Sequence, residues 1–347
     1  MTDATEGAVA EDAFAFTGTW REYLPIAASN FFLTILTLGI FRSWAKARER
    51  RYLWSHTIFI DDRLEWTGTG KEMFIGLLFA MLVAALPLFL LNLLAQSLAL
   101  HGQPLLAGLI TFGIYLFAML LFGFARFRAL RYRLSRTWWH GIRGGSDVKG
   151  GHYAWSSLWK TAVGFFAASF LMPWALTSLW NERWNAMSFG PHRFDAAANT
   201  DGLMARWALF VIAPAVIAFA GIAMAISSGP ALLFIPFLLA YAGYFVGGLV
   251  FYAAYFRKVI GTLQLGEIGF VFEASDWDLA KLILGDIALV ICTIGLGSMF
   301  LSYRHWSFLI RHLGATGLVD LENFTQSTAR VPREAEGFAD ALDIGAF

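Results

Sequence analysis

Two long stretches of this chain contain no Asp, Glu, Lys or Arg. The first lies between Glu72 and Arg126, and the second lies between Arg206 and Arg257. Each covers about 50 residues, whereas one helical span needs roughly 20 apolar residues, so each stretch can cross a bilayer twice. Turn-forming residues stand near the middle of each, at 101–104 and 227–230, where a helical hairpin would reverse. The sequence therefore predicts a polytopic membrane protein.

Composition supports this class and excludes others. The chain is 58% hydrophobic and only 15% charged, which is well below the charged fraction of a soluble globular protein. The formal net charge of +1 argues against nucleic acid as a partner, because binding driven by counterion release needs a basic surface. The single cysteine, Cys292, excludes a disulfide framework and a cysteine-based metal site within one chain.

Three further apolar segments are each about one span long, at Leu24–Phe41, Thr161–Asn181 and Leu282–Tyr303. Together with the two charge-free stretches they predict an all-α polytopic membrane protein with about seven transmembrane helices. Residues 1–13 form an acidic N-terminal tail. The polar, acidic residues 327–347 are predicted to be a disordered C-terminal tail.

Internal similarity predicts repeated modules. A shift of 256 residues brings Thr37-Leu38-Gly39 onto Thr293-Ile294-Gly295, and a shift of 80 brings Arg48 and Arg51 onto Arg128 and Arg131. The repeated unit contains a short strand, an apolar helix and a β-type loop. We therefore divide the chain into module 1 at 14–136, module 2 at 137–263 and half-module 3 at 264–326. The connecting loops are predicted to form short β-hairpins, the first with its turn at Asp61-Asp62.

Several motifs resemble those of one family. They are Phe16-x-Gly18, Asn30, Leu33–Ile40, Trp44-Ala45, Arg51-Tyr52, Leu130–Tyr132, Gly141–Arg143 and Ser188–Phe194. As a set they resemble the YjgN-like family of bacterial inner-membrane proteins, over most of residues 14–325. The region around Trp20, Leu24 and Glu65-Trp66 departs from the family pattern. The resemblance implies a multi-pass protein of the bacterial inner membrane and supplies no catalytic residues.

The distribution of Lys and Arg predicts an orientation. Seven spans would place 19 of these residues on one side and seven on the other, which puts the basic loops and the C-terminus in the cytoplasm and the N-terminus outside. A rival interpretation makes the three single segments re-entrant, reversing at Gly39, Pro173 and Gly295. Every β-type loop would then face the cytoplasm and could join one sheet. The sequence leaves both arrangements open.

Asp286 is the sharpest candidate for chemistry, because an acid within an apolar segment usually faces a bundle interior, a water-filled path or a partner. It occupies the repeat position that corresponds to Asn30, so the two residues form a candidate intramembrane polar site. The alternative is an interfacial acid neutralised by Lys281 or by a loop arginine.

Basic and aromatic residues at the helix ends suggest contacts with anionic lipid. The candidates are Arg48, Arg51, Arg128 and Arg131, although such residues are also ordinary membrane anchors. His56, His192 and His312 recur in the repeat, but a repeated polar residue at a helix end explains them better than a metal site does. No metal and no cofactor is predicted.

Two classes of function remain open. Inverted modules and Asp286 favour a transporter or channel-like protein that acts on an unknown small solute. Basic, aromatic loops and the lack of any motif favour a non-catalytic envelope scaffold or a lipid-interacting protein. The partners of such a scaffold or lipid-interacting protein would be the bilayer and an unknown protein. An enzyme is not predicted, because no nucleophile elbow, paired acids or metal-ligand spacing occurs in the sequence.

Overall fold

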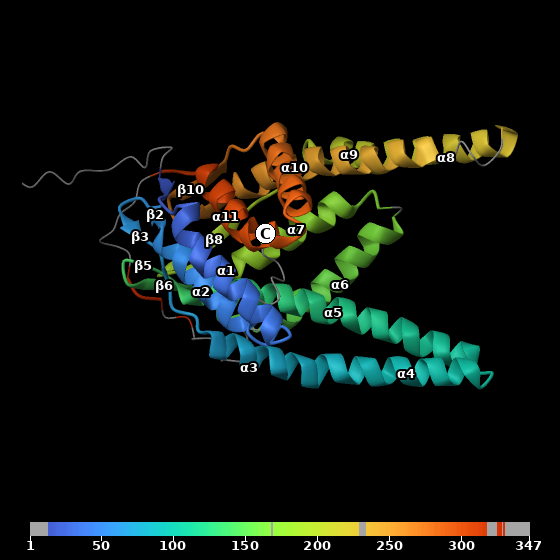
Figure 1. Cartoon of the computed structure of the whole chain (residues 1–347), viewed down its shortest axis with the longest axis horizontal. Helices are drawn as coiled ribbons and strands as arrows, with labels where there is room; N and C mark the ends of the chain where they lie inside the picture. The colour runs from blue at the N-terminus through green and yellow to red at the C-terminus, as the bar shows by residue number, and fades with distance from the viewer. Residues whose placement is uncertain (1–12, 168, 229–233, 318–324, 328, 330–347) are drawn as a thin grey trace, which may run out of the picture.

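The computed structural model describes residues 13–167, 169–228, 234–317, 325–327 and 329, in which short strands alternate with pairs of helices. The strands gather at one end of the molecule, and two long helical pairs extend away from that end in the same general direction (Figure 1). The predicted N-terminal tail, apart from Ala13, and most of the predicted C-terminal tail lie outside the described residues. So do Gly229 and Pro230 of the second predicted turn.

The strands form two antiparallel sheets in which neighbours in sequence are neighbours in space. One sheet contains β1 (Phe14–Phe16), β2 (Thr57–Phe59) and β3 (Asp62–Arg63). The other runs in order through β4 (Glu65–Trp66), β5 (Thr137–Trp139), β6 (Ile142–Gly145), β7 (Ser188–Phe189), β8 (His192–Ala196), β9 (Leu263–Leu265), β10 (Ile268–Phe272) and β11 (Leu313–Thr316). Only Leu64 separates β3 from β4, and β1 contacts β11. The strands thus follow one another around a ring, which we call the strand ring.

Four hairpins of the strand ring have two-residue loops, at Ile60-Asp61, His140-Gly141, Gly190-Pro191 and Gly266-Glu267. The first residue of each loop has a positive φ, between 50° and 61°, as the tight turns that match strand twist require. The predicted hairpin after residue 54 is confirmed, with its loop one residue earlier than expected, because Asp62 pairs with Phe59. The all-α prediction was too simple, since the separate hairpins join into continuous sheets.

The two charge-free stretches form the long pairs, as predicted. In the first, α3 (Gly70–Ala80), the π-helical η1 (Met81–Ala85) and α4 (Leu86–Leu100) run into one another and pack against α5 (Pro104–Arg136). In the second, α8 (Leu203–Ser228) packs against α9 (Phe234–Ile260). At 1.5 Å per residue, the 33 residues of α5 extend about 50 Å, longer than the roughly 30 Å of a bilayer core. Between 6% and 17% of each apolar window is buried in the protein, so these helices present their side chains to lipid.

The three single apolar segments form short helical pairs. These are α1 (Trp20–Leu36) with α2 (Arg42–Ser55), α6 (Gly151–Phe166) with α7 (Met172–Asn185), and α10 (Asp276–Cys292) with η3 (Leu296–Phe300) and α11 (Leu301–Arg311). None of the three segments is one continuous helix. Within the described residues, only the four long helices have the length and composition to cross a membrane, so the predicted count of about seven spans is not confirmed.

The reversal in two short pairs comes from the repeated Thr-Leu/Ile-Gly motif. Leu38 and Gly39 have φ of 49° and 91°, and Ile294 and Gly295 have φ of 53° and 88°. A left-handed backbone ends an α-helix and turns the chain back. The Thr37 hydroxyl donates to Leu33 O at 2.7 Å and accepts from Phe41 N–H at 2.9 Å, which fixes the turn. The tips point apolar side chains away from the protein, with Leu38 94% and Ile294 93% exposed.

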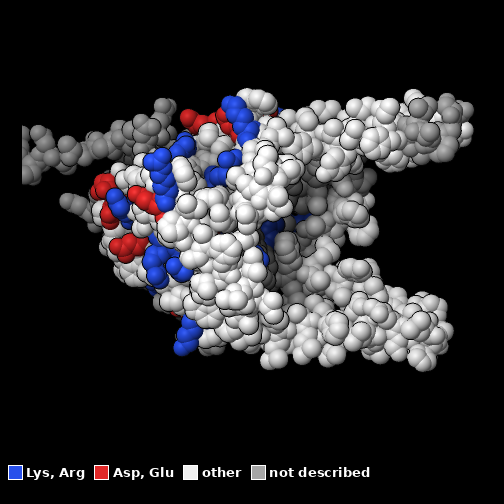
Figure 2. All heavy atoms as spheres, in the orientation of Figure 1, with Lys and Arg blue, Asp and Glu red and all other residues white. Residues whose placement is uncertain are grey.

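Charge is segregated along the molecule. Lys, Arg, Asp and Glu gather on the strand ring and the adjoining helix ends, whereas the long pairs show an uncharged surface (Figure 2). A hollow separates the two long pairs, and basic side chains are visible at its base (Figure 2). The main hydrophobic core lies at the ring end and includes Phe127, Trp139 and Phe251, each at most 1% exposed. The predicted modules 14–136, 137–263 and 264–326 stay a prediction, and the boundary between the last two falls within β9.

Candidate functional site

Asp286 is buried in α10 and joins the two limbs of its own short pair. Its Oδ1 accepts a hydrogen bond from Arg304 Nε at 2.5 Å, and its Oδ2 lies 2.6 Å from His305 Nε2, both on α11. Lys281, the alternative partner considered from sequence, instead pairs with Asp278 at 3.3 Å. The acid is therefore neutralised by an arginine from the returning helix.

Asn30 has the equivalent role in the first short pair. Its Nδ2 donates to Ala45 O on α2 at 3.1 Å, and its buried Oδ1 has no hydrogen-bond partner in the described part of the chain. The middle pair is joined in the same way, since Lys160 of α6 contacts Glu182 of α7 at 2.8 Å. Asn30 and Asp286 thus each bond within a separate pair, and a joint polar site between them stays a prediction.

The four predicted lipid-contacting arginines differ in exposure. Arg48 and Arg51 are exposed on α2. Arg128 is half-buried, with its guanidinium 4.4 Å from the centre of the Phe124 ring. Arg131 is buried and donates from Nη1 to Val148 O at 2.7 Å, so it supports the loop before α6. Contact with a lipid head group remains a prediction for the exposed pair.

The repeated histidines mark helix ends in two cases. His56 and His312 cap α2 and α11, and the Nδ1 of each lies 2.8 Å from the carbonyl oxygen four residues earlier. His192 instead begins β8. Among the described residues there is no cluster of three or more His, Cys, Asp or Glu side chains placed to hold a metal ion.

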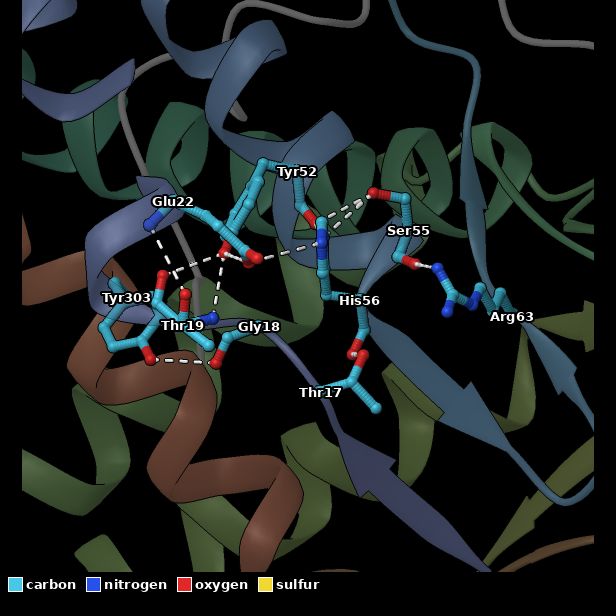
Figure 3. A network of polar contacts seen from close by, with 9 residues as sticks. All are labelled: Thr17, Gly18, Thr19, Glu22, Tyr52, Ser55, His56, Arg63 and Tyr303. Carbon is cyan, nitrogen blue, oxygen red and sulfur yellow. Dashed lines mark hydrogen bonds and ion pairs between the residues drawn. The ribbon is translucent and has the colours of Figure 1, made fainter. Parts of the chain in front are cut away.

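A polar network joins the first short pair to the last helix (Figure 3). Tyr52 Oη donates to Thr19 O at 2.9 Å and accepts from Thr19 N–H at 3.0 Å, while Tyr303 Oη donates to Gly18 O at 3.0 Å. The Thr19 hydroxyl lowers the pKa of the Glu22 carboxyl, and burial raises the pKa of Tyr52 to about 12. These contacts join the segment after β1, the first strand, to α11, the helix that precedes β11.

A concave feature lies between the strand ring and the helices. It is a cavity of about 450 Å³, within the range of small-molecule and cofactor sites. Its walls come from α5, α7, α9, α10, α11 and the four strands β8 to β11. Most lining residues are apolar or aromatic: Leu130, Trp180, Trp184, Phe194, Ala253, Phe256, Ile260, Leu263, Phe270, Phe272, Ala274, Leu279, Leu282, Ile283, Phe308, Leu309 and Leu313. The cationic or titratable lining residues are Arg133, Arg183 and His305.

Arg183 is the unusual member of this lining. It is 3% exposed, and its Nε and Nη1 have no hydrogen-bond partner in the described part of the chain. Its guanidinium lies 5.5 Å from the centre of the Trp180 ring. Burial lowers the pKa of Arg183, and the neighbouring cation Arg126 acts in the same direction. A buried cation without an acid is costly, which makes this position the candidate functional residue.

From the sequence, Arg183 contributes only to the total of Lys and Arg on each side of the membrane. Its one local signal is its spacing on α7, three residues after Trp180, on a face that also carries Leu176 and Leu179. That spacing places a lone cation on an apolar helix face. Burial and the missing counter-ion depend on α5 and α9, which are distant in sequence.

Comparisons with known proteins agree with the membrane class. A family model described as "Bacterial protein of unknown function (DUF898)" matches residues 11–341. The inner membrane protein YjgN of Salmonella typhimurium (strain LT2) is 33% identical over 101 residues, which cover 29% of this chain and 23% of that protein. YjgN of Escherichia coli (strain K12) is 37% identical over 71 residues, or 20% of this chain and 18% of that protein. The chain thus aligns with less than a quarter of either relative. No solved structure matches it.

Proposed function

Because this chain belongs to the DUF898 family of bacterial proteins, and its YjgN relatives are inner membrane proteins, we propose that it is an integral membrane protein that binds lipid in the cavity beneath its strand ring. The family membership agrees with the resemblance found in the sequence. The observation that carries the proposal is the apolar cavity of about 450 Å³, built by helices that continue into lipid-exposed spans.

The position of the cavity supports a lipid ligand. Its α9 lining residues, from Ala253 to Ile260, lie at the ring end of a candidate span, whose remaining length is exposed. Trp180 and Trp184 line it as well, and tryptophan is enriched at the depth of lipid head groups. A lipid from the surrounding leaflet would enter with its acyl chain on the apolar wall.

A transporter or channel has less support. An intramembrane solute path needs polar groups that face one another between spans. The long pairs are charge-free across their apolar windows, and Asp286 and Asn30 are bonded within short pairs. These features favour the lipid-interacting alternative over solute transport.

The fold also supports a one-sided orientation. Both long pairs begin and end at strands of the ring, so a pair that crosses the bilayer returns its chain to the starting side. The basic loops lie at this ring end, and the excess of Lys and Arg predicts that it faces the cytoplasm. We therefore place both the strand ring and the C-terminus in the cytoplasm, and the tips of the long pairs outside.

The function is tested by filling the cavity. Ile283 of α10 lines it, whereas Ile287, one turn further along the same helix, is 44% exposed. Wild-type protein purified in mild detergent should carry bound lipid in native mass spectrometry. Ile283→Trp should lose that lipid because the larger side chain occupies the cavity, and Ile287→Trp should retain it. Equal retention by both variants, or wild type without lipid, would contradict the proposal.

A further inference from the structure

Arg183 has donors and charge that the described protein does not satisfy. Nε and Nη1 are buried without partners, and the side chain lines the cavity. Buried polar groups in proteins are nearly always hydrogen-bonded, and buried charges are paired. A ligand that supplies both acceptors and negative charge would complete this position.

Three acidic residues of the neighbouring helices, Glu182, Asp276 and Asp286, already have basic partners. Glu182, the next residue on α7, contacts Lys160 at 2.8 Å. Asp276 accepts from Arg257 Nη2 at 2.6 Å, and Asp286 is held by Arg304 and His305. Within the described ranges, no acid contributes to the electrostatic surroundings of Arg183, which instead include a second cation, Arg126.

The aromatic hydroxyls do not replace an anion. Tyr153 and Tyr255 lie near the guanidinium, but Tyr255 Oη donates to Leu176 O at 3.3 Å. The described neighbours of Arg183 thus include a second cation and no carboxylate.

The other walls define the remainder of the ligand. Leu279, Leu282 and Ile283 of α10 and Phe308 of α11 give an apolar surface suited to a hydrocarbon chain. Guanidinium groups match phosphate and carboxylate oxygens in geometry as well as charge. Deepening the proposed lipid-binding function, on which this step rests, we infer that Arg183 binds the phosphodiester head group of an anionic lipid whose acyl chain lies in the cavity.

Two lipids with identical acyl chains test the assignment. Dioleoyl phosphatidylglycerol carries an anionic phosphodiester, and dioleoylglycerol has the same acyl chains without any phosphate. Titrated onto delipidated full-length protein in detergent and followed by native mass spectrometry, wild type should bind the anionic lipid about tenfold more tightly, the effect of one charge-assisted hydrogen bond. Arg183→Met should bind the two lipids alike, and Arg183→Lys should retain part of the preference.

A matched control is Arg193→Met, which removes an exposed arginine of the strand ring next to the lining residue Phe194. This variant should keep the full preference for the anionic lipid. Thermal unfolding without lipid checks the fold: Arg183→Met should be at least as stable as wild type, since it removes an unpaired buried charge. The anionic lipid should then raise the Tm of wild type and of Arg193→Met more than that of Arg183→Met.

The outcomes separate the two proposals. If neither lipid binds wild type, the proposed lipid-binding function fails. If wild type binds both lipids equally well and Arg183→Met changes nothing, lipid binding stands and the head-group assignment is overturned, leaving water as the partner of Arg183. Inorganic phosphate that raises the Tm of wild type as much as the anionic lipid does would also overturn it, because a free anion would then suffice.

Discussion

The short and long helical pairs have similar apolar sequences and different structures. Both begin and end at the strand ring, yet the long pairs continue for 27 to 33 residues per helix in α5 and α9, while α1 and α10 end after 17. Each short pair also contains a polar contact between its two helices, which we call its polar tie. The comparison teaches that apolar length alone does not define a span, because the position of left-handed turn residues decides where the chain reverses.

The polar tie in the third short pair should be the most sensitive feature. Asp286→Ala leaves Arg304 and His305 without their acid and should lower the free energy of unfolding by about 2 kcal/mol. The loss is smaller than for a fully buried pair because the Arg304 side chain is 34% exposed. Equilibrium unfolding in mixed micelles measures this decrease in the free energy of unfolding.

The long pair offers the contrasting variant. Gln96 of α4 donates to Asn92 Oδ1 at 2.6 Å on an exposed face, so Gln96→Ala should cost less than about 0.5 kcal/mol. Similar losses from the two substitutions would remove the distinction between tied and untied pairs.

Two glycines in open space should respond with opposite signs. Gly39 has a φ of 91°, and no atom lies within 4 Å of the position that an added methyl group would take, so Gly39→Ala should destabilise by about 1 kcal/mol through backbone strain alone. Gly108 has equally open surroundings in the interior of α5, and Gly108→Ala should stabilise by about 0.5 kcal/mol. Equilibrium unfolding measures both changes, and a gain at Gly39 would show that its left-handed turn is not required.

Tyr52 should give the smallest effect at neutral pH and a specific one in alkali. Its pKa in the folded protein is about 12, above the usual value near 10, so its contribution to stability is complete below about pH 10 and is lost as the pH rises to 12. Tyr52→Phe should remove this alkaline loss.

Sequence reasoning succeeded where the decisive interactions are local. Charge-free length and the turn at 101–104 predicted the first long pair, in which α4 ends at Leu100, Gly102 has a φ of 76° and α5 starts at Pro104. The repeated Thr-Leu/Ile-Gly motif was recognised, and in the structure it forms the same turn twice. Hairpin loops were predicted because two-residue turns also depend on local backbone preference.

Other features depend on residues that are far apart in sequence. Segments of 18 to 22 apolar residues were assigned as spans because their length fits one, whereas ties such as Lys160 to Glu182 hold them as bent pairs. Joining of the hairpins into one ring depends on partners up to 73 residues apart, such as Glu65 with Trp138. Arg183 was not predicted as a functional residue, because its burial without a counter-ion arises only when the helices that line the cavity come together.

The central claim is that every helical pair returns to one side of the membrane. It is tested most directly by single cysteines introduced into a Cys292→Ser background and treated with a membrane-impermeant thiol reagent in intact cells. Gln103, at the tip of the first long pair, and Val148 and Ala197, at the ring end, are all exposed positions. Gln103→Cys should label, while Val148→Cys and Ala197→Cys should label only after the membrane is permeabilised. Labelling of Ala197→Cys in intact cells would contradict this account and restore the seven-span topology.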